Sequence, residues 1–300
     1  MQLPDKRYIC RMSLVESNSK GITYMLIAVA SFAVMNALAK MLHHIPSHEL
    51  VFFRSIIVFF ISLYYVLKLK LPILGNNTTW LILRGVSGLS ALLLFFMTLK
   101  NMPLASATSL QYLSPIFTVL FASVMNNQSV RPVQWLYFFL AFCGVLMIKG
   151  FDDRVNMNWL MVGVLAALIA GFAYNSIIKC RKTDHAYTIV IHLTFISLPV
   201  TGIWCLFDFV MPQGTEWLVL LCMGVSTQVA QYYSTKALMT ASAATITPWN
   251  YVGALFSVII GYFFFQEGIE WLAVIGMCII VVSLILNSRL KEIASIEKSS

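Results

Sequence analysis

The chain has 300 residues, of which 59% are hydrophobic and only 11% are charged, and its mean hydropathy is +0.82. A soluble domain of this length needs a polar surface that this composition does not supply. The net charge is +8, but the basic residues are spread along the chain and do not cluster as in a nucleic-acid interface. We therefore expect an integral membrane protein that lies in a lipid bilayer and binds no nucleic acid.

The two ends of the chain lack an apolar run. Residues 1–20 are polar and mixed in charge, which is not the pattern of a signal peptide, and residues 289–300 are also polar. We expect both segments to be tails outside the bilayer. The six cysteines form no C-x-x-C pair and are interpreted as packing residues, so no metal and no cofactor is expected.

Between the tails, apolar runs recur that are each about 20 residues long, the length that a helix needs to cross the bilayer core. They predict an all-α integral membrane protein with ten transmembrane helices. The expected spans are residues 21–42, 49–68, 78–99, 103–125, 132–149, 158–180, 187–208, 216–236, 242–264 and 269–288.

The distribution of Lys and Arg among the loops predicts the orientation. With a cytoplasmic N-terminus, most of them fall in the tails and the even-numbered loops, and only Lys40, Lys100, Lys149 and Arg154 fall on the opposite side. This bias follows the positive-inside rule. It predicts a multi-pass protein of the inner cell membrane with both termini cytoplasmic.

The chain contains an internal repeat. The segment 100–135 recurs 136 residues later as 236–271, with Lys and Trp matching at its ends and Ala-Ser-Ala returning inside it. Such self-similarity predicts a duplicated unit. The two units are expected at residues 21–149 and 150–288.

Each predicted unit holds five spans, an odd number, so the second unit enters the membrane from the opposite side. The first spans of the two units also match, since Asn36 and Lys40 correspond to Asn175 and Lys179 at the same four-residue spacing. The sequence thus predicts two inverted five-helix repeats, the arrangement with which many transporters form one site between two gates.

Several motifs occur in the order found in EamA-type drug/metabolite transporters: His48-Glu49-Leu50-Val51-Phe52-Phe53-Arg54, Leu83-Arg84-Gly85, Pro115 and Pro248 inside spans, and Phe265-Gln266-Glu267. With ten spans in a five-plus-five order, the chain resembles this family over about residues 20–290. It departs at Gln128, where similar chains carry an acid that matches Glu267. The resemblance implies alternating-access transport of a small metabolite through a central cavity.

Arg54 and Arg84 are the only formal charges well inside a predicted span. An arginine at the centre of a bilayer costs about 2.5–3.5 kcal/mol on insertion scales. One interpretation is that both line a cavity and bind a carboxylate or phosphate of the substrate. The other is that they snorkel or hold neighbouring helices together. The sequence leaves both interpretations open.

No Asp or Glu lies in the middle of a predicted span. Ion-coupled carriers commonly use a buried carboxylate as the coupling group, so this pattern favours facilitated diffusion or exchange. His192 is the one group in the spans that titrates near neutral pH, and we interpret it as a structural residue.

Uncharged polar side chains gather in spans one, four, six, eight and nine. Because they are costly against lipid, each is expected to contact another helix or a wet cavity. Pro115 and Pro248 are expected to act as hinges or to free backbone acceptors in mid-span. The candidate substrate-binding residues are Asn36, Arg54, Arg84, Gln111, Tyr112, Ser114, Tyr174, Asn175, Gln228, Gln231, Tyr232, Trp249 and Asn250.

These features predict a secondary transporter of an amino acid, an adenosyl amino acid or a nucleoside-like compound. The alternative is a channel or a non-transporting scaffold, although a channel would show a filter repeat. No H-E-x-x-H or G-x-S-x-G motif occurs, so an enzyme is not expected. The sequence does not fix the direction of transport, nor does it distinguish a monomer from a homodimer.

Overall fold

The computed structural model describes residues 6–42, 44–101, 110–126, 130–149, 157–265 and 271–297, and these residues form helices and no strand. Gln128, Glu267 and the first residues of the expected span 103–125 lie outside the described residues. The helices are α1 (Lys6–Met41), α2 (Ser47–Lys68), α3 (Thr78–Asn101), α5 (Ser114–Met125), α6 (Pro132–Lys149), α7 (Met157–Cys180), α8 (Ala186–Cys205), α9 (Glu216–Thr240), α10 (Ala243–Ile246), η1 (Thr247–Tyr251), α11 (Val252–Phe265) and α12 (Trp271–Glu297).

Within the described residues, six helical segments are long and apolar enough to cross a bilayer: Asn18–Met41, Ser47–Lys68, Thr78–Thr98, Met157–Cys180, Ala186–Cys205 and Ala243–Phe264. Three shorter apolar helices, within α5, α6 and α12, accompany them. Helices suit a bilayer because their backbone polar groups are satisfied within the segment. The predicted class, an all-helical membrane protein, agrees with this structure.

The long helix α9 is absent from this group of apolar segments because it carries many polar residues. Its side chains Thr227, Gln228 and Ser234 are nevertheless buried among the other helices. A polar helix is stable in a membrane protein when its polar face contacts protein or water and not lipid.

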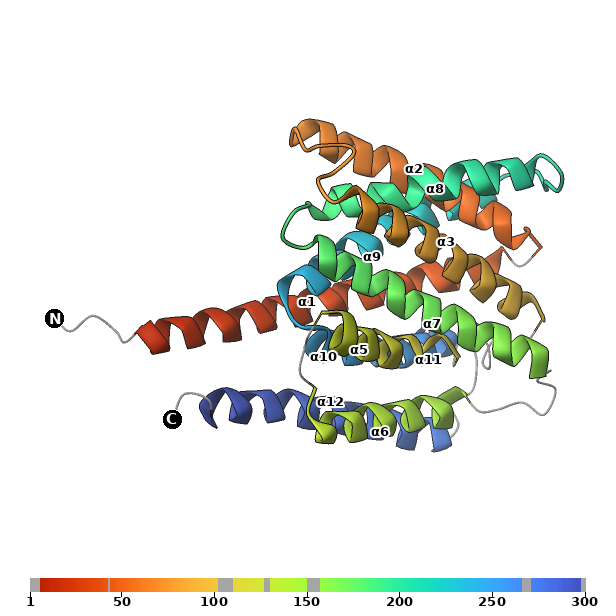
Figure 1. Cartoon of the computed structure of the whole chain (residues 1–300). Coiled ribbons are helices and arrows are strands. Elements are labelled where there is room, and N and C mark those ends of the chain that lie inside the picture. The colour runs from red at the N-terminus through yellow and green to blue at the C-terminus, as the bar shows by residue number, and fades with distance from the viewer. Residues whose placement is uncertain are drawn as a thin grey trace.

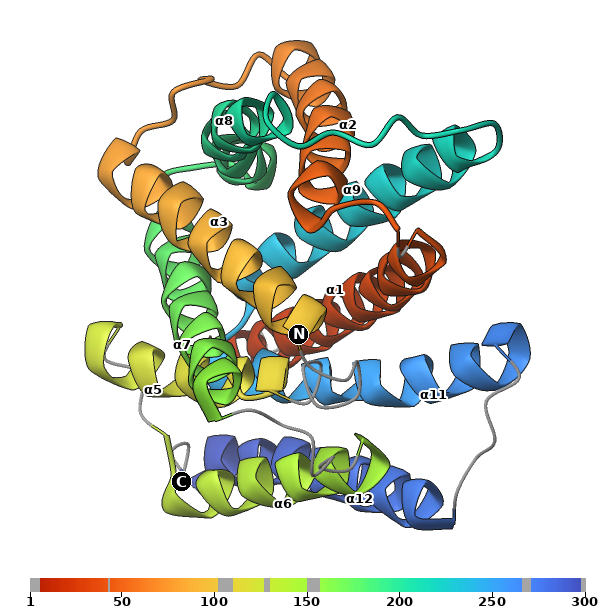
Figure 2. The same cartoon turned by 90° about the vertical axis from the view of Figure 1, so that its right-hand side faces the viewer.

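The helices pack in pairs that draw on distant parts of the chain. The largest contacts join α1 with α9, α3 with α7, α2 with α8 and α6 with α12. Figure 2 shows α3, α7 and α5 on one side of the bundle and α9, α1 and α11 on the other, with α2 and α8 above and α6 and α12 below. The N-terminal end of α1 and the C-terminal end of α12 lie at the same end of the bundle (Figure 1).

Two helical segments are interrupted at proline. Residues 110 and 111 are helical, residues 112 and 113 form a turn, and α5 begins at Ser114 with Pro115 in its first turn. In the later segment, α10 passes into the 3₁₀ helix η1, which contains Pro248, before α11 begins. Proline has no backbone N–H and its ring clashes with the preceding turn, so both prolines break their helices.

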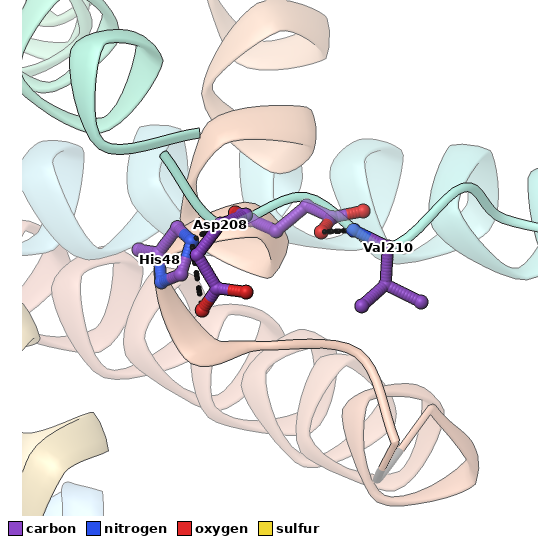
Figure 3. Close-up of polar contacts among 4 residues, drawn as sticks. His48, Asp208 and Val210 are labelled. Atoms are coloured by element: carbon purple, nitrogen blue, oxygen red, sulfur yellow. Dashed lines mark hydrogen bonds and ion pairs between the residues drawn. The ribbon is translucent and has the colours of Figure 1, made fainter. Parts of the chain in front are cut away.

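Two buried carboxylates tie loops to helix starts on different parts of the bundle. Glu49 at the start of α2 accepts a hydrogen bond from Val210 N (2.9 Å), while its neighbour His48 donates to the Asp208 carbonyl oxygen (2.8 Å; Figure 3). Asp184, just before α8, accepts hydrogen bonds from the backbone N–H groups of Asn76 (2.5 Å) and Asn77 (3.2 Å). We call these contacts the Glu49 clasp and the Asp184 clasp.

The Asp184 clasp gives the first testable prediction. Asp184→Ala leaves two backbone N–H groups without their acceptor, so we expect it to lower stability by about 1–3 kcal/mol. Asp208→Ala is the matched control, because the Asp208 side chain is 59% exposed and only 3.9 Å from His48 Nε2. The melting temperature in detergent measures both; an equal loss in the two variants would contradict the clasp.

Candidate substrate-binding cavity

A cavity of about 260 Å³ lies between the helices, and its lining comes from α1, α2, α3, α5, α7, α8, α9, η1 and α11. Most of the lining is apolar or aromatic, with a limited set of polar side chains, as is usual for small-molecule sites. The polar and charged lining residues are Asn36, Lys40, Arg54, Arg84, Gln111, Tyr112, Ser114, Tyr174, Gln231 and Asn250.

The two arginines reach this cavity from neighbouring helices. Arg54 on α2 and Arg84 on α3 are each 4% exposed. Arg54 Nη1 lies 3.6 Å from Met35 Sδ, and Arg84 Nη2 donates to Gln231 Oε1 at 3.1 Å. Arg84 Nε has no hydrogen-bond partner, and within the described part of the chain neither arginine forms an ion pair with a carboxylate. Both guanidinium groups therefore carry charge that only neutral groups contact.

Gly88 makes room for the Arg84 side chain. It lies one helical turn after Arg84 on α3 and also lines the cavity. A Cβ added at Gly88 would collide with Arg84 Nη1 and would meet Leu193 Cδ1 at 2.8 Å. The guanidinium group thus folds along its own helix, across the space that a side chain at residue 88 would fill.

The two helix breaks bring polar groups to the same cavity. Gln111 and Tyr112 precede α5, Ser114 begins it, and Asn250 lies in η1. The Oε1 atom of Gln111 is buried without a hydrogen-bond partner. Interrupted helices that line a solute cavity are a recurring feature of secondary transporters.

Four of the candidate residues are not part of the lining, because other helices engage their polar or aromatic groups. Gln228 accepts a hydrogen bond from Ser62 Oγ (3.1 Å), and Tyr232 stacks on Tyr187 with ring centroids 4.3 Å apart. Trp249 packs against the apolar core. Asn175 is fully buried on α7. Their contacts fit the helix–helix role that the sequence left open for each polar residue.

Asn175 and Lys179 connect α7 to the C-terminal end of α5. Asn175 Nδ2 donates to the Thr118 carbonyl oxygen (2.9 Å), and Asn175 Oδ1 accepts from Asn126 Nδ2 (2.7 Å). Lys179 Nζ donates to the Met125 carbonyl oxygen (2.5 Å), at the helix end where a cation interacts favourably with the dipole. The matching pair on α1, Asn36 and Lys40, lines the cavity instead.

An aromatic cluster lies beyond the cavity, toward the end of the bundle where α1 begins. Lys236 Nζ lies 4.6 Å from the ring centroid of Tyr24 and 5.5 Å from that of Tyr232, and Tyr187 stacks on Tyr232. Beside this group, burial and then the Lys236 charge lower the pKa of His185, in the α7–α8 turn. We call these five residues the Lys236 cluster.

Sequence reasoning missed Gly88 and the apolar part of the lining, which includes Phe32, Phe95 and Leu193. Apolar residues fill every span, so nothing in the sequence separates a cavity wall from core or lipid-facing surface. Gly88 had a signal, since it lies close after Arg84 on the same helix. His192 donates or accepts through Nδ1 at the Thr188 carbonyl oxygen (2.7 Å), as a structural histidine does.

Apolar helices around a solute-sized polar cavity define the class of the protein, a multi-pass membrane transport protein. The model of the EamA-like transporter family matches residues 19–150 and again residues 157–289. The chain belongs to the EamA-like transporter family.

Relatives with named substrates agree with this family. The chain is 30% identical over 279 residues to the pseudopaline exporter CntI of Pseudomonas aeruginosa, covering 91% of this chain and 97% of the exporter. It is 26% identical over 262 residues to the S-adenosylmethionine uptake transporter of Rickettsia conorii, covering 82% and 85%. A solved crystal structure, 16% identical, superposes with a TM-score of 0.79 over 91% of this chain and 99% of that one, so the fold is shared.

Proposed function

We propose that the protein is a secondary transporter that moves a small organic metabolite through the cavity by alternating access, in exchange or by facilitated diffusion. The substrate is an amino acid, an adenosyl amino acid or a nucleoside-like compound. The observation that carries this proposal is the polar cavity, lined by helices from both segments that match the family. The nine candidate residues in its lining are the proposed substrate contacts.

The architecture that we propose has ten spans in two inverted five-helix repeats, residues 21–149 and 150–288, with cytoplasmic tails at 1–20 and 289–300. Exchanging the two sets of helices supports it. The exchange turns the contact of α1 with α9 into that of α7 with α3, and it maps the α2–α8 and α6–α12 contacts onto themselves. Both helix breaks, at Pro115 and Pro248, also correspond.

The clasps follow the same exchange. The spacing of 136 residues relates His48-Glu49 to Asp184-His185, so each repeat has an acid and an imidazole at the start of its second helix. In each case the carboxylate accepts from the loop that precedes the third helix of the other repeat. Two independent sequences arriving at this contact supports a shared, inverted plan.

Different surroundings of matched residues support alternating access. Asn36 and Lys40 face the cavity, whereas Asn175 and Lys179 bind the end of α5. In an inverted pair, the opposite state arises when the repeats exchange conformations. In that state Asn36 and Lys40 bind the end of α11, Asn175 and Lys179 line the cavity, and the Lys236 cluster, which closes the near end here, separates.

Counterflow in liposomes tests the transport function. A radiolabelled member of a metabolite library should exchange with its unlabelled form in a saturable, trans-stimulated manner, and a pH gradient alone should drive no uphill accumulation. Linear, non-saturable flux would indicate a channel, and no flux with any solute would remove the transport proposal. Uphill accumulation driven by protons would contradict the exchange or diffusion mode.

Cysteine labelling tests the orientation. Leu74, between α2 and α3, and Met211, between α8 and α9, are 72% and 64% exposed, so a cysteine at either position is accessible. An impermeant maleimide should label Met211→Cys from outside intact cells and Leu74→Cys only after permeabilisation. Labelling of both from the same side would contradict the inverted arrangement with cytoplasmic termini.

A further inference from the structure

The charge of the cavity is unbalanced. Arg54, Arg84 and Lys40 line it, and none of the described lining residues is Asp or Glu. The contacts of Arg54 and Arg84 are to a thioether and an amide, which carry no charge. Two guanidinium groups in a membrane interior, each without a countercharge, are costly to enclose.

The charge of the substrate decides whether the cavity can close around it. A neutral substrate leaves both guanidinium groups uncompensated, and a substrate with one negative charge leaves one. A zwitterion adds an ammonium group to a site that offers it no carboxylate. Two anionic groups would balance both arginines through charge-assisted hydrogen bonds, the stronger kind.

We propose that the substrate is an organic dianion whose two anionic groups bind Arg54 and Arg84, such as a dicarboxylate or an amino-acid derivative with an additional acid group. This inference rests on the proposed transport function and narrows its substrate class. The unpartnered Arg84 Nε provides a free donor for one of the anionic groups, and the N-terminal end of α5 at Ser114 adds a favourable dipole. The buried, unpartnered Gln111 Oε1 accepts from a donor elsewhere on the substrate.

The test compares two ligands of nearly the same shape that differ by one charge. Succinate has two carboxylates at pH 7.5, and succinamate replaces one of them with an amide. Purified protein in detergent is melted with increasing amounts of each at matched ionic strength, because a ligand that binds the folded state raises the melting temperature. We expect succinate to bind roughly tenfold or more tightly than succinamate, the size of one charge-assisted hydrogen bond.

Variants assign this preference to the arginines. Arg54→Gln and Arg84→Gln should each remove it, and Arg84→Lys, which keeps the charge, should retain part of it and guards against loss of the fold. Arg181→Gln is the matched control, because Arg181 is exposed in the α7–α8 turn and its loss removes the same charge outside the cavity. Equal shifts with the two ligands, no shift with either, or a preference that survives in both Gln variants would overturn the proposal. Counterflow of a neutral metabolite would then leave the transport function standing, whereas absence of all flux would remove that function itself.

Discussion

Gly88→Ala is expected to reduce transport about 10- to 150-fold while the protein remains folded, the range that corresponds to losing a charge-assisted hydrogen bond. The added Cβ collides with Arg84 Nη1, at the far end of a long and flexible side chain. Arg84 can therefore move aside at little cost to the fold, but its guanidinium group then leaves the position between Gln231 and the cavity. Initial uptake rates in liposomes measure the effect.

Gly202→Ala on α8 is the matched control for this prediction. A Cβ at Gly202 would meet only the Phe52 ring, at 3.2 Å, and Gly202 does not line the cavity. We expect its transport and its melting temperature to stay near those of the unchanged protein. If Gly88→Ala transported as well as Gly202→Ala, the position of Arg84 would not matter for transport.

Asn175→Ala is expected to lower the stability of the observed conformation by about 1–3 kcal/mol and to slow transport. It removes the donor to the Thr118 carbonyl oxygen and the acceptor for Asn126, so a buried polar group between α7 and α5 loses its partner. The closed end then opens more readily, and the two states of the carrier are no longer close in free energy. The melting temperature and the exchange rate measure the two effects.

Asn36→Ala is the comparison that makes this prediction sharp, because Asn36 occupies the matching position on α1 and is exposed to the cavity. We expect it to leave the melting temperature nearly unchanged, since no helix contact is lost in this conformation. Equal destabilisation by the two alanine variants would show that the matched positions do not alternate between an open and a closed environment.

The sequence predicted the helical membrane class and the family well, because both depend on features that are local or recur in order along the chain. Apolar runs of bilayer length mark the helices, and the match of residues 19–150 and 157–289 to one family model agrees with the internal repeat. Prolines 115 and 248 also marked the helix breaks, since the missing N–H acts at its own position.

The candidate site was harder to predict, because a polar residue in a span has the same sequence signal whether it faces a cavity or another helix. Asn36 and Asn175 illustrate this. They match in type and spacing, yet one lines the cavity and the other joins α7 to α5. Gln228 and Gln231 differ in the same way, although they lie one turn apart on α9.

By itself, the sequence determined that this chain crosses a membrane as helices and belongs with duplicated transporters, because composition and repetition need no knowledge of the neighbours in space. Only the tertiary structure decided that Arg54 and Arg84 meet in one cavity without a carboxylate, and that Gly88 leaves room for one of them. The physical reason is that the free energy of a buried charge depends on the groups around it, and helices distant in sequence supply those groups.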